Sequence, residues 1–207
     1  MGVLENKSRA RCFYKYLSKV YDRVNSVVFT RPMRAEALAM LDLEGTERVL
    51  DVGCGTGFGT EGLLAYAEDV VGVDQSPHQL GKARERLDER TGVSFSLGDA
   101  ENLPFEDDAF DAAWSSGSIE YWPRPVLGLR EMRRVVEPGG KVLVIGPNDP
   151  QSWIGRRVAD AIMLFYDVEE ADEMFAAAGF VDVEHKRLSS RYKSDLAIVS
   201  VGTVPAE

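Results

Sequence analysis

The stretch "VLDVGCGTGFG", Val49 to Gly59, decides the fold, because it places four glycines in seven residues directly behind an apolar run. An apolar run of this length is typical of a buried strand. Glycines after such a strand bare the main chain, so that a ligand can approach it at the start of the next helix. The stretch therefore predicts a strand, a glycine turn and a helix that bind a nucleotide-type cofactor.

Short apolar runs and helical segments alternate along the chain after Arg48. The expected strands are "RVLDV", "DVVGVD", "VSFSL", "FDAAWSS" and "KVLVIG", and the expected helices span 57–67, 77–90 and 125–136. Strands separated by such helices indicate crossover units and a mainly parallel sheet. The terminal runs "VDVEHKRL" and "LAIVSVGT" are joined by a short connection, which predicts an antiparallel pair. The expected fold class is α/β, a Rossmann-like sheet of seven strands, mainly parallel with an antiparallel terminal strand.

Residues 1–44 read as a helical cap in front of the main domain, 45–207, and the two are expected to form one structural unit. The clearest helical piece is "RPMRAEALAMLDL", in which Pro32 suits a first turn. Its expected apolar face is formed by Met33, Ala37, Met40 and Leu41.

Two capping boxes also follow from the pattern of polar residues. Ser76 with Gln79 and Asp167 with Glu170 have the spacing of an N-cap and its partner at the third helical position. Gly179 is expected to close the second of these helices.

Composition bounds the class of protein. The 207 residues fit one domain, and 34 acidic against 24 basic residues give a net charge of −10, which disfavours nucleic acid as a partner. Cys12 and Cys54 form neither a disulfide framework nor a zinc motif, so no metal is expected. Without a membrane-span-length apolar run or a signal peptide, the expected location is cytoplasmic, with peripheral contact at the inner face of the membrane left open.

The glycine turn departs from the dinucleotide fingerprint G-x-G-x-x-G, because Phe58 stands where the third glycine belongs. Instead, an acid stands before the first glycine, Asp51 in "LDVGCGTG", a second comes after the next strand, Asp74 in "VGVD", and a third after the third strand, Asp99 in "LGDA". This order of motifs resembles the class I S-adenosylmethionine-dependent methyltransferases, over nearly the whole chain from Val49 onward. The resemblance implies S-adenosylmethionine as the cofactor and S-adenosylhomocysteine as its product.

Each acid has a role implied by the resemblance. Asp74 would accept both ribose hydroxyls, Asp99 with Ala100 would contact the adenine, and Asp51 would face the methionine amine. The structural alternatives are a helix N-terminal charge for Asp74 and a plain turn aspartate for Asp99. Cys54 is expected to be a small filler rather than a nucleophile. The full set of expected cofactor-binding residues is Asp51, Gly53, Cys54, Gly55, Gly57, Asp74, Gln75, Asp99, Ala100 and Ser115.

The segment after the fourth expected strand bears on the methyl acceptor. It reads "SSGSIEYWPRP", 115–125, where enzymes that methylate exocyclic or amide nitrogens often carry "NPPY". Residues 117–166 resemble the methyltransferases of prenylated benzoquinols in tocopherol and plastoquinone synthesis. The early "YDRVN", 21–25, resembles the ubiquinone and menaquinone methyltransferase group. Both resemblances imply carbon methylation of a quinol ring that carries a prenyl tail.

A quinol hydroxyl titrates near a phenol, at about 10, so ring attack needs a group that draws off its proton. The candidate catalytic residues are Glu120 and Tyr121, just past the strand "FDAAWSS", and Asp149, past "KVLVIG". His78 and His185 are expected to be surface or structural residues rather than the base.

Two questions stay open at this level. The helix expected at 152–166 either lines a channel for the prenyl tail, rests on the membrane surface or packs in the core. The acceptor could also be the oxygen or nitrogen of a soluble small molecule, and a non-catalytic S-adenosylmethionine-binding module has the same fold. The sequence does not indicate an oligomeric state.

Overall fold

A single mixed sheet organises the protein in the computed structural model, which describes residues 30–148, 167–189 and 197–206. Its strand order is β3-β2-β1-β4-β5-β7-β6. Strands β1 to β5 are parallel, and β7 is antiparallel to both β5 and β6. The expected fold class is therefore confirmed. The strands are β1 (Arg48–Val52), β2 (Asp69–Asp74), β3 (Val93–Leu97), β4 (Phe110–Ser116), β5 (Val136–Pro147), β6 (Val181–Leu188) and β7 (Ala197–Thr203).

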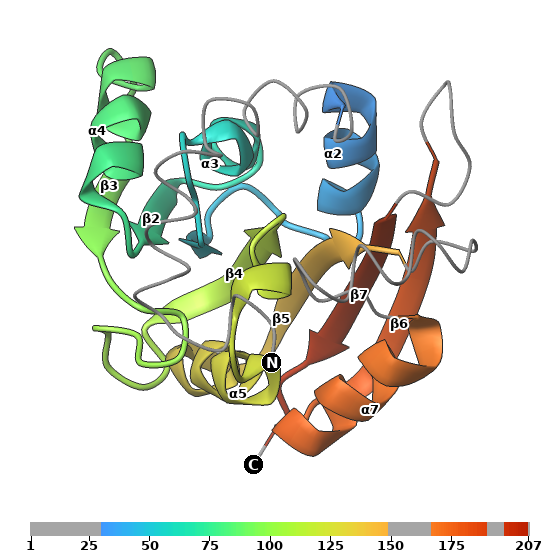
Figure 1. The fold of residues 1–207 in the computed structure, drawn as a ribbon. Helices are drawn as coiled ribbons and strands as arrows, with labels where there is room; N and C mark the ends of the chain where they lie inside the picture. Colours follow the sequence, from blue (N-terminus) through green and yellow to red (C-terminus); the bar gives the residue numbers. More distant parts are fainter. Residues whose placement is uncertain (1–29, 149–166, 190–196, 207) are drawn as a thin grey trace.

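Helices cover both faces of the sheet (Figure 1). On one face lie α2 (Arg31–Leu38), α3 (Phe58–Leu63) and α4 (Pro77–Arg86), and on the other lie α5 (Pro125–Val135) and α7 (Val168–Ala178). A short 3-10 turn, η2 (Ile119–Tyr121), follows β4. This is the three-layer arrangement that buried parallel strands require.

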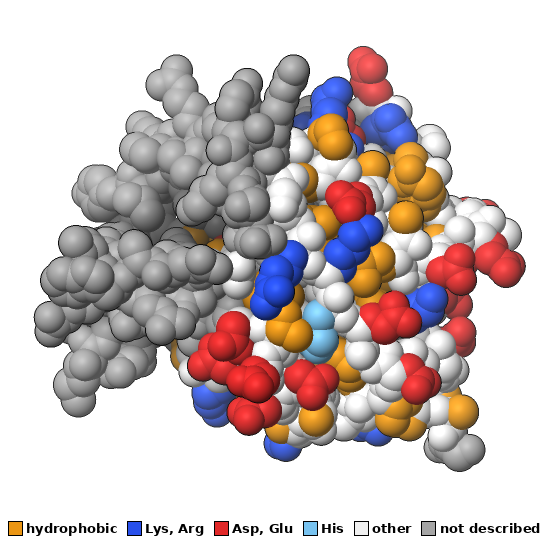
Figure 2. Space-filling view, turned by 90° about the vertical axis from the view of Figure 1, so that its right-hand side faces the viewer, with side chains coloured by type: hydrophobic (Ala, Val, Ile, Leu, Met, Phe, Trp, Pro, Cys, Tyr) orange, Lys and Arg blue, Asp and Glu red, His pale blue; other side chains and the backbone are white. Residues whose placement is uncertain are grey.

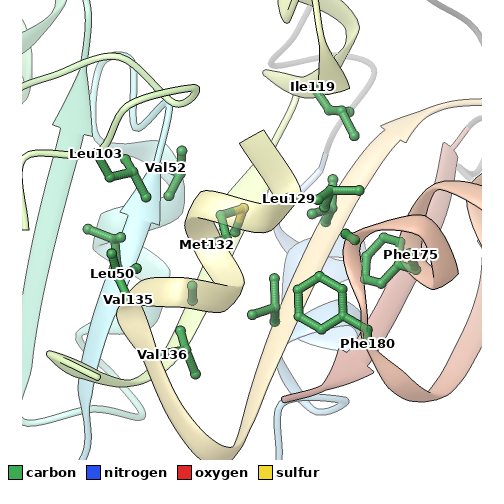
Figure 3. Close-up of a cluster of buried hydrophobic side chains, with 14 of the residues drawn as sticks. Leu50, Val52, Leu103, Ile119, Leu129, Met132, Val135, Val136, Phe175 and Phe180 are labelled. Carbon is green, nitrogen blue, oxygen red and sulfur yellow. The ribbon is translucent and has the colours of Figure 1, made fainter. Parts of the chain in front are cut away.

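The face under α5 holds the larger of two apolar clusters (Figure 3). Leu129, Met132 and Val135 lie one helical turn apart along α5 and are fully buried. They meet Leu50 and Val52 of β1, together with apolar side chains of α7, as Figure 3 shows. Because strand side chains alternate between faces, Val49 and Asp51 point to the opposite side, toward α2 and α3.

The second cluster joins α2 to that opposite face. Met33 and Ala37 are buried there with Val49, Trp114 and Leu143 of the sheet. Of the remaining residues expected on the apolar face of α2, Leu41 is buried and Met40 is half-buried. Residues 1–29, which make up most of the expected cap, lie outside the described residues.

The capping predictions differ in their outcome. At α7, Asp167 accepts from the Glu170 N–H and Glu170 accepts from the Asp167 N–H, so the box is complete, and Gly179 ends the helix at a φ of +91°. At α4, the Ser76 side chain accepts from the Gln79 N–H, but the buried Gln79 Oε1 has no hydrogen-bond partner among the described residues. Only one half of that box forms.

Element boundaries also differ from the prediction. Helix α4 ends at Arg86 rather than at 90. Helix α3 ends at Leu63 rather than at 67, because Ala65 and Tyr66 donate to Gly62 and Leu63, three residues back, which tightens the last turn. Strand β5 begins at Val136, directly after α5, because Val136 already pairs with Phe110 before a shift of register. The expected strand "KVLVIG", 141–146, lies in the C-terminal half of β5.

The face formed by α7 and β6 carries mixed charges, with acidic side chains gathered near α7 (Figure 2). The exposed acids of α7 are Glu169, Glu170, Asp172 and Glu173.

None of the helices in the described part of the chain is long and apolar enough to cross a membrane.

Candidate functional site

The glycine turn after β1 is held in a conformation that only glycine adopts readily. Gly53, Gly55 and Gly57 have φ values of +71°, +53° and +82°. The N–H groups of Gly53 and Cys54 both donate to the Val73 carbonyl, 2.8 and 3.1 Å away, which fastens the turn to the end of β2. No atom of the described residues lies within 4 Å of the position that a Cβ on Gly55 would take, so these residues leave this side of the turn open to a ligand.

Asp51 lies beneath this turn with only 2% of its surface exposed. The Thr60 hydroxyl donates to its Oδ2 at 2.6 Å. Burial, with a smaller contribution from the nearby charge of Asp74, raises the pKa of Asp51 from 3.8 to about 7. A carboxyl group with this pKa can exchange a proton near neutral pH and, once ionised, attracts a cation.

The fourth glycine of the motif makes room for Asp51. A Cβ on Gly59 would lie 2.8 Å from the Trp114 Nε1 and 3.0 Å from the Asp51 Oδ2. The buried Trp114 N–H has no hydrogen-bond partner among the described residues. Trp114 is the register partner of Asp51 across β1 and β4, so the indole and the carboxyl group share one face of the sheet. Sequence reasoning assigned no role to Trp114.

Asp74 stands at the end of β2 and binds the glycine turn directly. Its Oδ2 accepts from the Gly55 N–H at 2.9 Å, and its Oδ1 accepts from the Ser76 N–H at 2.8 Å. Burial raises its pKa despite these two bonds. Since each carboxylate oxygen has two acceptor positions, both oxygens keep capacity for the hydroxyls of a bound diol. Gln75, next along the chain, is exposed.

Asp99 lies in the loop after β3, where its Oδ1 accepts from the Glu101 N–H at 3.0 Å. Asp99 and Ala100 are both half-buried. The loops after β1, β2 and β3 leave the same edge of the parallel sheet, which is the edge where such sheets bind ligands. The three sequence-predicted acids thus come together at one edge.

Cys54 matches the expectation of a filler. It is buried, and its Sγ lies 2.9 Å from the place of a Cβ on Gly72. Burial raises the pKa of this thiol well above its ordinary value, so the thiolate is disfavoured.

The turn after β4 rests on the glycine turn. A Cβ on Gly53 would overlap the Ser118 side chain, so only glycine allows this approach. The Trp122 indole donates to the Ser118 Oγ at 3.0 Å, and its ring lies against Gly128 of α5. These contacts place η2, with Glu120 and Tyr121, next to the glycine turn. Sequence reasoning missed Ser118, although the requirement for glycine at 53 was a signal that something approaches closely.

Among the candidate catalytic residues, Glu120 is 5% exposed and Tyr121 is half-buried. Ser115 is fully buried in β4, and its hydroxyl has no hydrogen-bond partner within the described segments. Asp149, the expected helix 152–166 and "YDRVN" lie outside the described residues. No group of three or more His, Cys, Asp or Glu side chains in the described part of the chain could hold a metal ion.

The two histidines lie on α4 and β6. His78 is exposed on α4, and His185 lies in β6 with its Nδ1 2.9 Å from the Ser200 Oγ. The candidate site therefore consists of the glycine turn, of Asp51, Asp74 and Asp99 at the same edge of the sheet, and of η2 next to the turn.

Comparisons with known proteins agree with this geometry. Residues 50–144 match the family described as "Methyltransferase domain". The chain is 47% identical to the chloroplastic 2-methyl-6-phytyl-1,4-hydroquinone methyltransferase 2 of Oryza sativa subsp. japonica, over 91% of this chain and 55% of that protein. It is 30% identical to the demethylmenaquinone methyltransferase of Clavibacter sepedonicus, over 84% and 83%.

A solved structure supports the fold. The Haemonchus contortus phosphoethanolamine N-methyltransferase 2 in complex with S-adenosyl-L-methionine has a TM-score of 0.74 and 18% identity, over 87% of this chain and 56% of that one. The chain spans little more than half the length of the plant relatives it matches.

One prediction is corrected by these comparisons. The expected cytoplasmic location is wrong, because the four plant relatives, 45–47% identical, are all chloroplastic enzymes. That prediction rested on the lack of a leader pattern in the sequence, and the location of the four plant relatives is the stronger evidence.

The bacterial relative is covered over most of its length, and the glycine turn and its three acids lie in or beside the matched domain. The chain therefore belongs to the S-adenosylmethionine-dependent methyltransferase family.

Proposed function

We propose that the protein transfers a methyl group from S-adenosylmethionine to a ring carbon of a prenylated hydroquinone. The observation that carries this proposal is the 47% identity to a 2-methyl-6-phytyl-1,4-hydroquinone methyltransferase across 91% of the chain. The likeness to a demethylmenaquinone methyltransferase supports the same class of acceptor, a quinol with an apolar tail.

The site residues fit the cofactor. The open side of Gly55 admits a ligand to the main chain, and the buried carboxyl group of Asp51 suits the methionine ammonium. Asp74, fixed by two backbone N–H groups, suits the ribose hydroxyls, and Asp99 with Ala100 suits the adenine. The remaining proposed contacts are Gly53, Cys54, Gly57, Gln75 and Ser115.

The bound cofactor supplies an electrophilic methyl group, whose transfer forms a carbon–carbon bond and leaves a neutral thioether. The chain's own part is to hold the acceptor and to receive the proton of the quinol hydroxyl as the ring carbon attacks. The hydrogen on the methylated carbon then moves to the oxygen, which restores the aromatic quinol. We propose that a group on the turn that carries Glu120 and Tyr121 receives the hydroxyl proton. The contact of Ser118 with Gly53, which brings that turn against the glycine turn, supports this assignment. Asp149 is a further candidate.

We also propose that residues 1–44 and 45–207 act as one unit. The packing of Met33 and Ala37 of α2 against Val49 and Trp114 of the sheet supports this. A prenyl tail implies that the acceptor is delivered from a lipid phase, so peripheral membrane contact is part of the proposal.

The test is transfer of tritiated methyl from S-adenosylmethionine to reduced demethylated quinols, with label counted in the organic phase. We expect organic label from the wild type and its loss in Asp99→Ala, with the fold kept by circular dichroism. Absence of organic label, with cofactor binding intact, would reject the quinol and direct the search to water-soluble acceptors or to a sensing role.

A further inference from the structure

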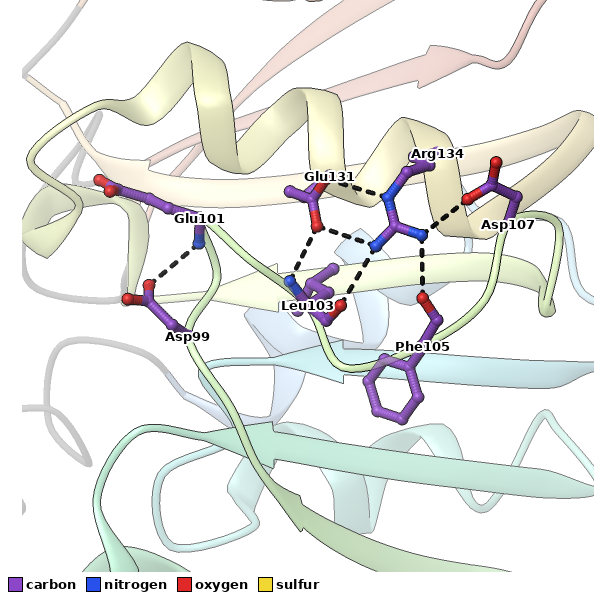
Figure 4. A network of polar contacts seen from close by, with 7 residues as sticks. All are labelled: Asp99, Glu101, Leu103, Phe105, Asp107, Glu131 and Arg134. Atoms are coloured by element: carbon purple, nitrogen blue, oxygen red, sulfur yellow. Dashed lines mark hydrogen bonds and ion pairs between the residues drawn. The ribbon is translucent and has the colours of Figure 1, made fainter.

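Glu101 is a buried acid that the proposed chemistry does not use. Its side chain is 1% exposed, although it lies in a loop at the edge of the sheet. Its N–H donates to the Asp99 Oδ1 at 3.0 Å, which Figure 4 shows. The backbone of Glu101 therefore fixes the side chain that is proposed to contact the adenine.

The Glu101 carboxylate is in turn held by Arg124. Its Oε1 accepts from the Arg124 backbone N–H at 2.7 Å. Its Oε2 accepts from the Arg124 Nη2 at 2.9 Å and from the Nε at 3.2 Å. A buried charge is tolerated when several donors surround it, and these three bonds meet that condition.

Arg124 connects this carboxylate to the other half of the site. It is the N-cap of α5 and follows η2, which carries Glu120 and Tyr121, by three residues. The Arg124 side chain is 66% exposed, so the pair consists of a buried acid and a largely solvated base. Glu101 therefore joins the loop after β3 to the turn after β4, through two residues that are 23 positions apart.

We propose that Glu101 is a positioning residue, which through Arg124 holds Asp99 and the Glu120 turn in a fixed relation. This inference rests on the proposed function, because it assigns the adenine to Asp99 and the acceptor to the Glu120 turn. Loss of the Glu101 charge would shift both segments and weaken the binding of cofactor and acceptor together.

The same loop has a second anchor that provides a matched control (Figure 4). Glu131 of α5 accepts from the Leu103 N–H at 2.8 Å and from Arg134 at 2.8 Å. Arg134 also donates to the Phe105 carbonyl at 2.9 Å. This network fastens the loop to α5 through Leu103, Phe105 and Asp107, which lie further along the loop than Glu101.

The experiment compares Glu101→Gln with Glu131→Gln. For each purified variant, the Kd of S-adenosylhomocysteine is measured by calorimetry, with the melting temperature and, with quinol, the KM of the acceptor. We expect both variants to melt at lower temperature. Only Glu101→Gln should raise the Kd and the acceptor KM, each by about tenfold or more, because small misplacement of binding groups is costly.

Three outcomes overturn the inference. One is a Kd for Glu101→Gln within about twofold of that for Glu131→Gln, and another is a rise in Kd without a rise in acceptor KM. If Glu101→Gln does not fold, Arg124→Met replaces it. This variant keeps the backbone bond to Glu101, should raise both constants to a smaller extent, and overturns the inference if it raises neither. A wild type that does not bind S-adenosylhomocysteine would reject the proposed function as well.

Discussion

At the scale of single residues, Asp51 shows how a buried position sets a chemical property. Burial raises its pKa to about 7, because the ionised carboxylate loses its hydration there. The Thr60 hydroxyl, which donates at 2.6 Å, offsets only part of that cost. In the proposed complex, a cation at this carboxylate would favour the ionised form.

The first prediction concerns pH. The folded protein binds the Asp51 proton more tightly than the unfolded chain does, so this group's contribution to the free energy of unfolding falls as pH rises from about 4 to about 7. Over the upper part of this window, S-adenosylhomocysteine should bind more tightly as pH rises, because more of the carboxylate is ionised. Calorimetry and urea unfolding at several pH values measure both trends.

The matched control is Asp51→Asn, which keeps the shape of the side chain and has no proton to exchange. Its cofactor affinity should be low and should vary less with pH than that of the wild type. Identical pH profiles for the two proteins would contradict the assignment of the titrating group to Asp51.

A second prediction compares two glycines at which the backbone conformation would strain any other residue. Gly53 and Gly139 both have positive φ, but only at Gly53 would a Cβ overlap a neighbour, Ser118. Gly139→Ala should cost about 1 to 2 kcal/mol in the free energy of unfolding and leave cofactor binding unchanged. Gly53→Ala should in addition displace the turn after β4 and abolish cofactor binding. Equal cofactor affinity in the two folded variants would speak against the contact.

At the scale of elements, α2 is fastened to the start of α3 by one side chain. The Arg34 guanidinium lies 4.4 Å from the centre of the Phe58 ring, and its Nη1 donates to the Phe58 carbonyl. Glu61 lies 3.5 Å from the same Nη1. Gly62 leaves room for this arginine, because a Cβ at this position would lie 2.5 Å from the Arg34 Nε. The helix after the glycine turn is thus held from outside the sheet.

The third prediction follows from that contact. Arg34→Met keeps the apolar stem but removes the hydrogen bond and the ion pair, and it should lower the free energy of unfolding by about 1 to 3 kcal/mol in urea titration. Arg48→Met is the comparison, because Arg48 also lies over a ring, that of Phe110 at 4.9 Å, but its side chain is half-exposed. Its cost should stay below about 1 kcal/mol. A larger cost for Arg48→Met would contradict the account.

Which elements the sequence could predict depends on how local their causes are. Strand β1, the glycine turn and the Asp167 cap follow from neighbouring residues, and the structure confirms them. The contact of Ser118 with Gly53 and the bonds of Arg124 to Glu101 join residues 65 and 23 positions apart. Periodicity does not encode such contacts, because they depend on the path of two loops. The three acids were predictable because each lies at or just past the carboxyl end of an expected strand.

At the scale of the whole molecule, the strand order explains where the site lies. The chain runs from β1 outward through β2 and β3 and then returns to β4, on the other side of β1. The helices that follow β1 and β4, α3 and α5, lie on opposite faces of the sheet, so the carboxyl ends of these two strands are the switch point at which such sheets bind ligands. Asp51 and the turn at Ser118 lie at this point.

The fourth prediction concerns the net charge of −10. Mutual repulsion among surface acids, such as those gathered near α7 in Figure 2, opposes the compact state and is screened by salt. The melting temperature should therefore rise by a few degrees between low salt and about 0.5 M sodium chloride. The salt should be a chloride, because sulfate also raises the melting temperature through its exclusion from the protein surface, which is not charge screening. A melting temperature that falls over this range would contradict the expectation.

The central claim is that methyl is transferred to a ring carbon of a prenylated hydroquinone. It is tested most directly by incubating the protein with trideuteromethyl S-adenosylmethionine and a reduced demethylated prenyl quinol, followed by nuclear magnetic resonance of the extracted product. The account predicts the label on a ring carbon, with both hydroxyls still free. Label on a quinol oxygen, or unlabelled quinol beside a protein that binds the cofactor, would contradict it.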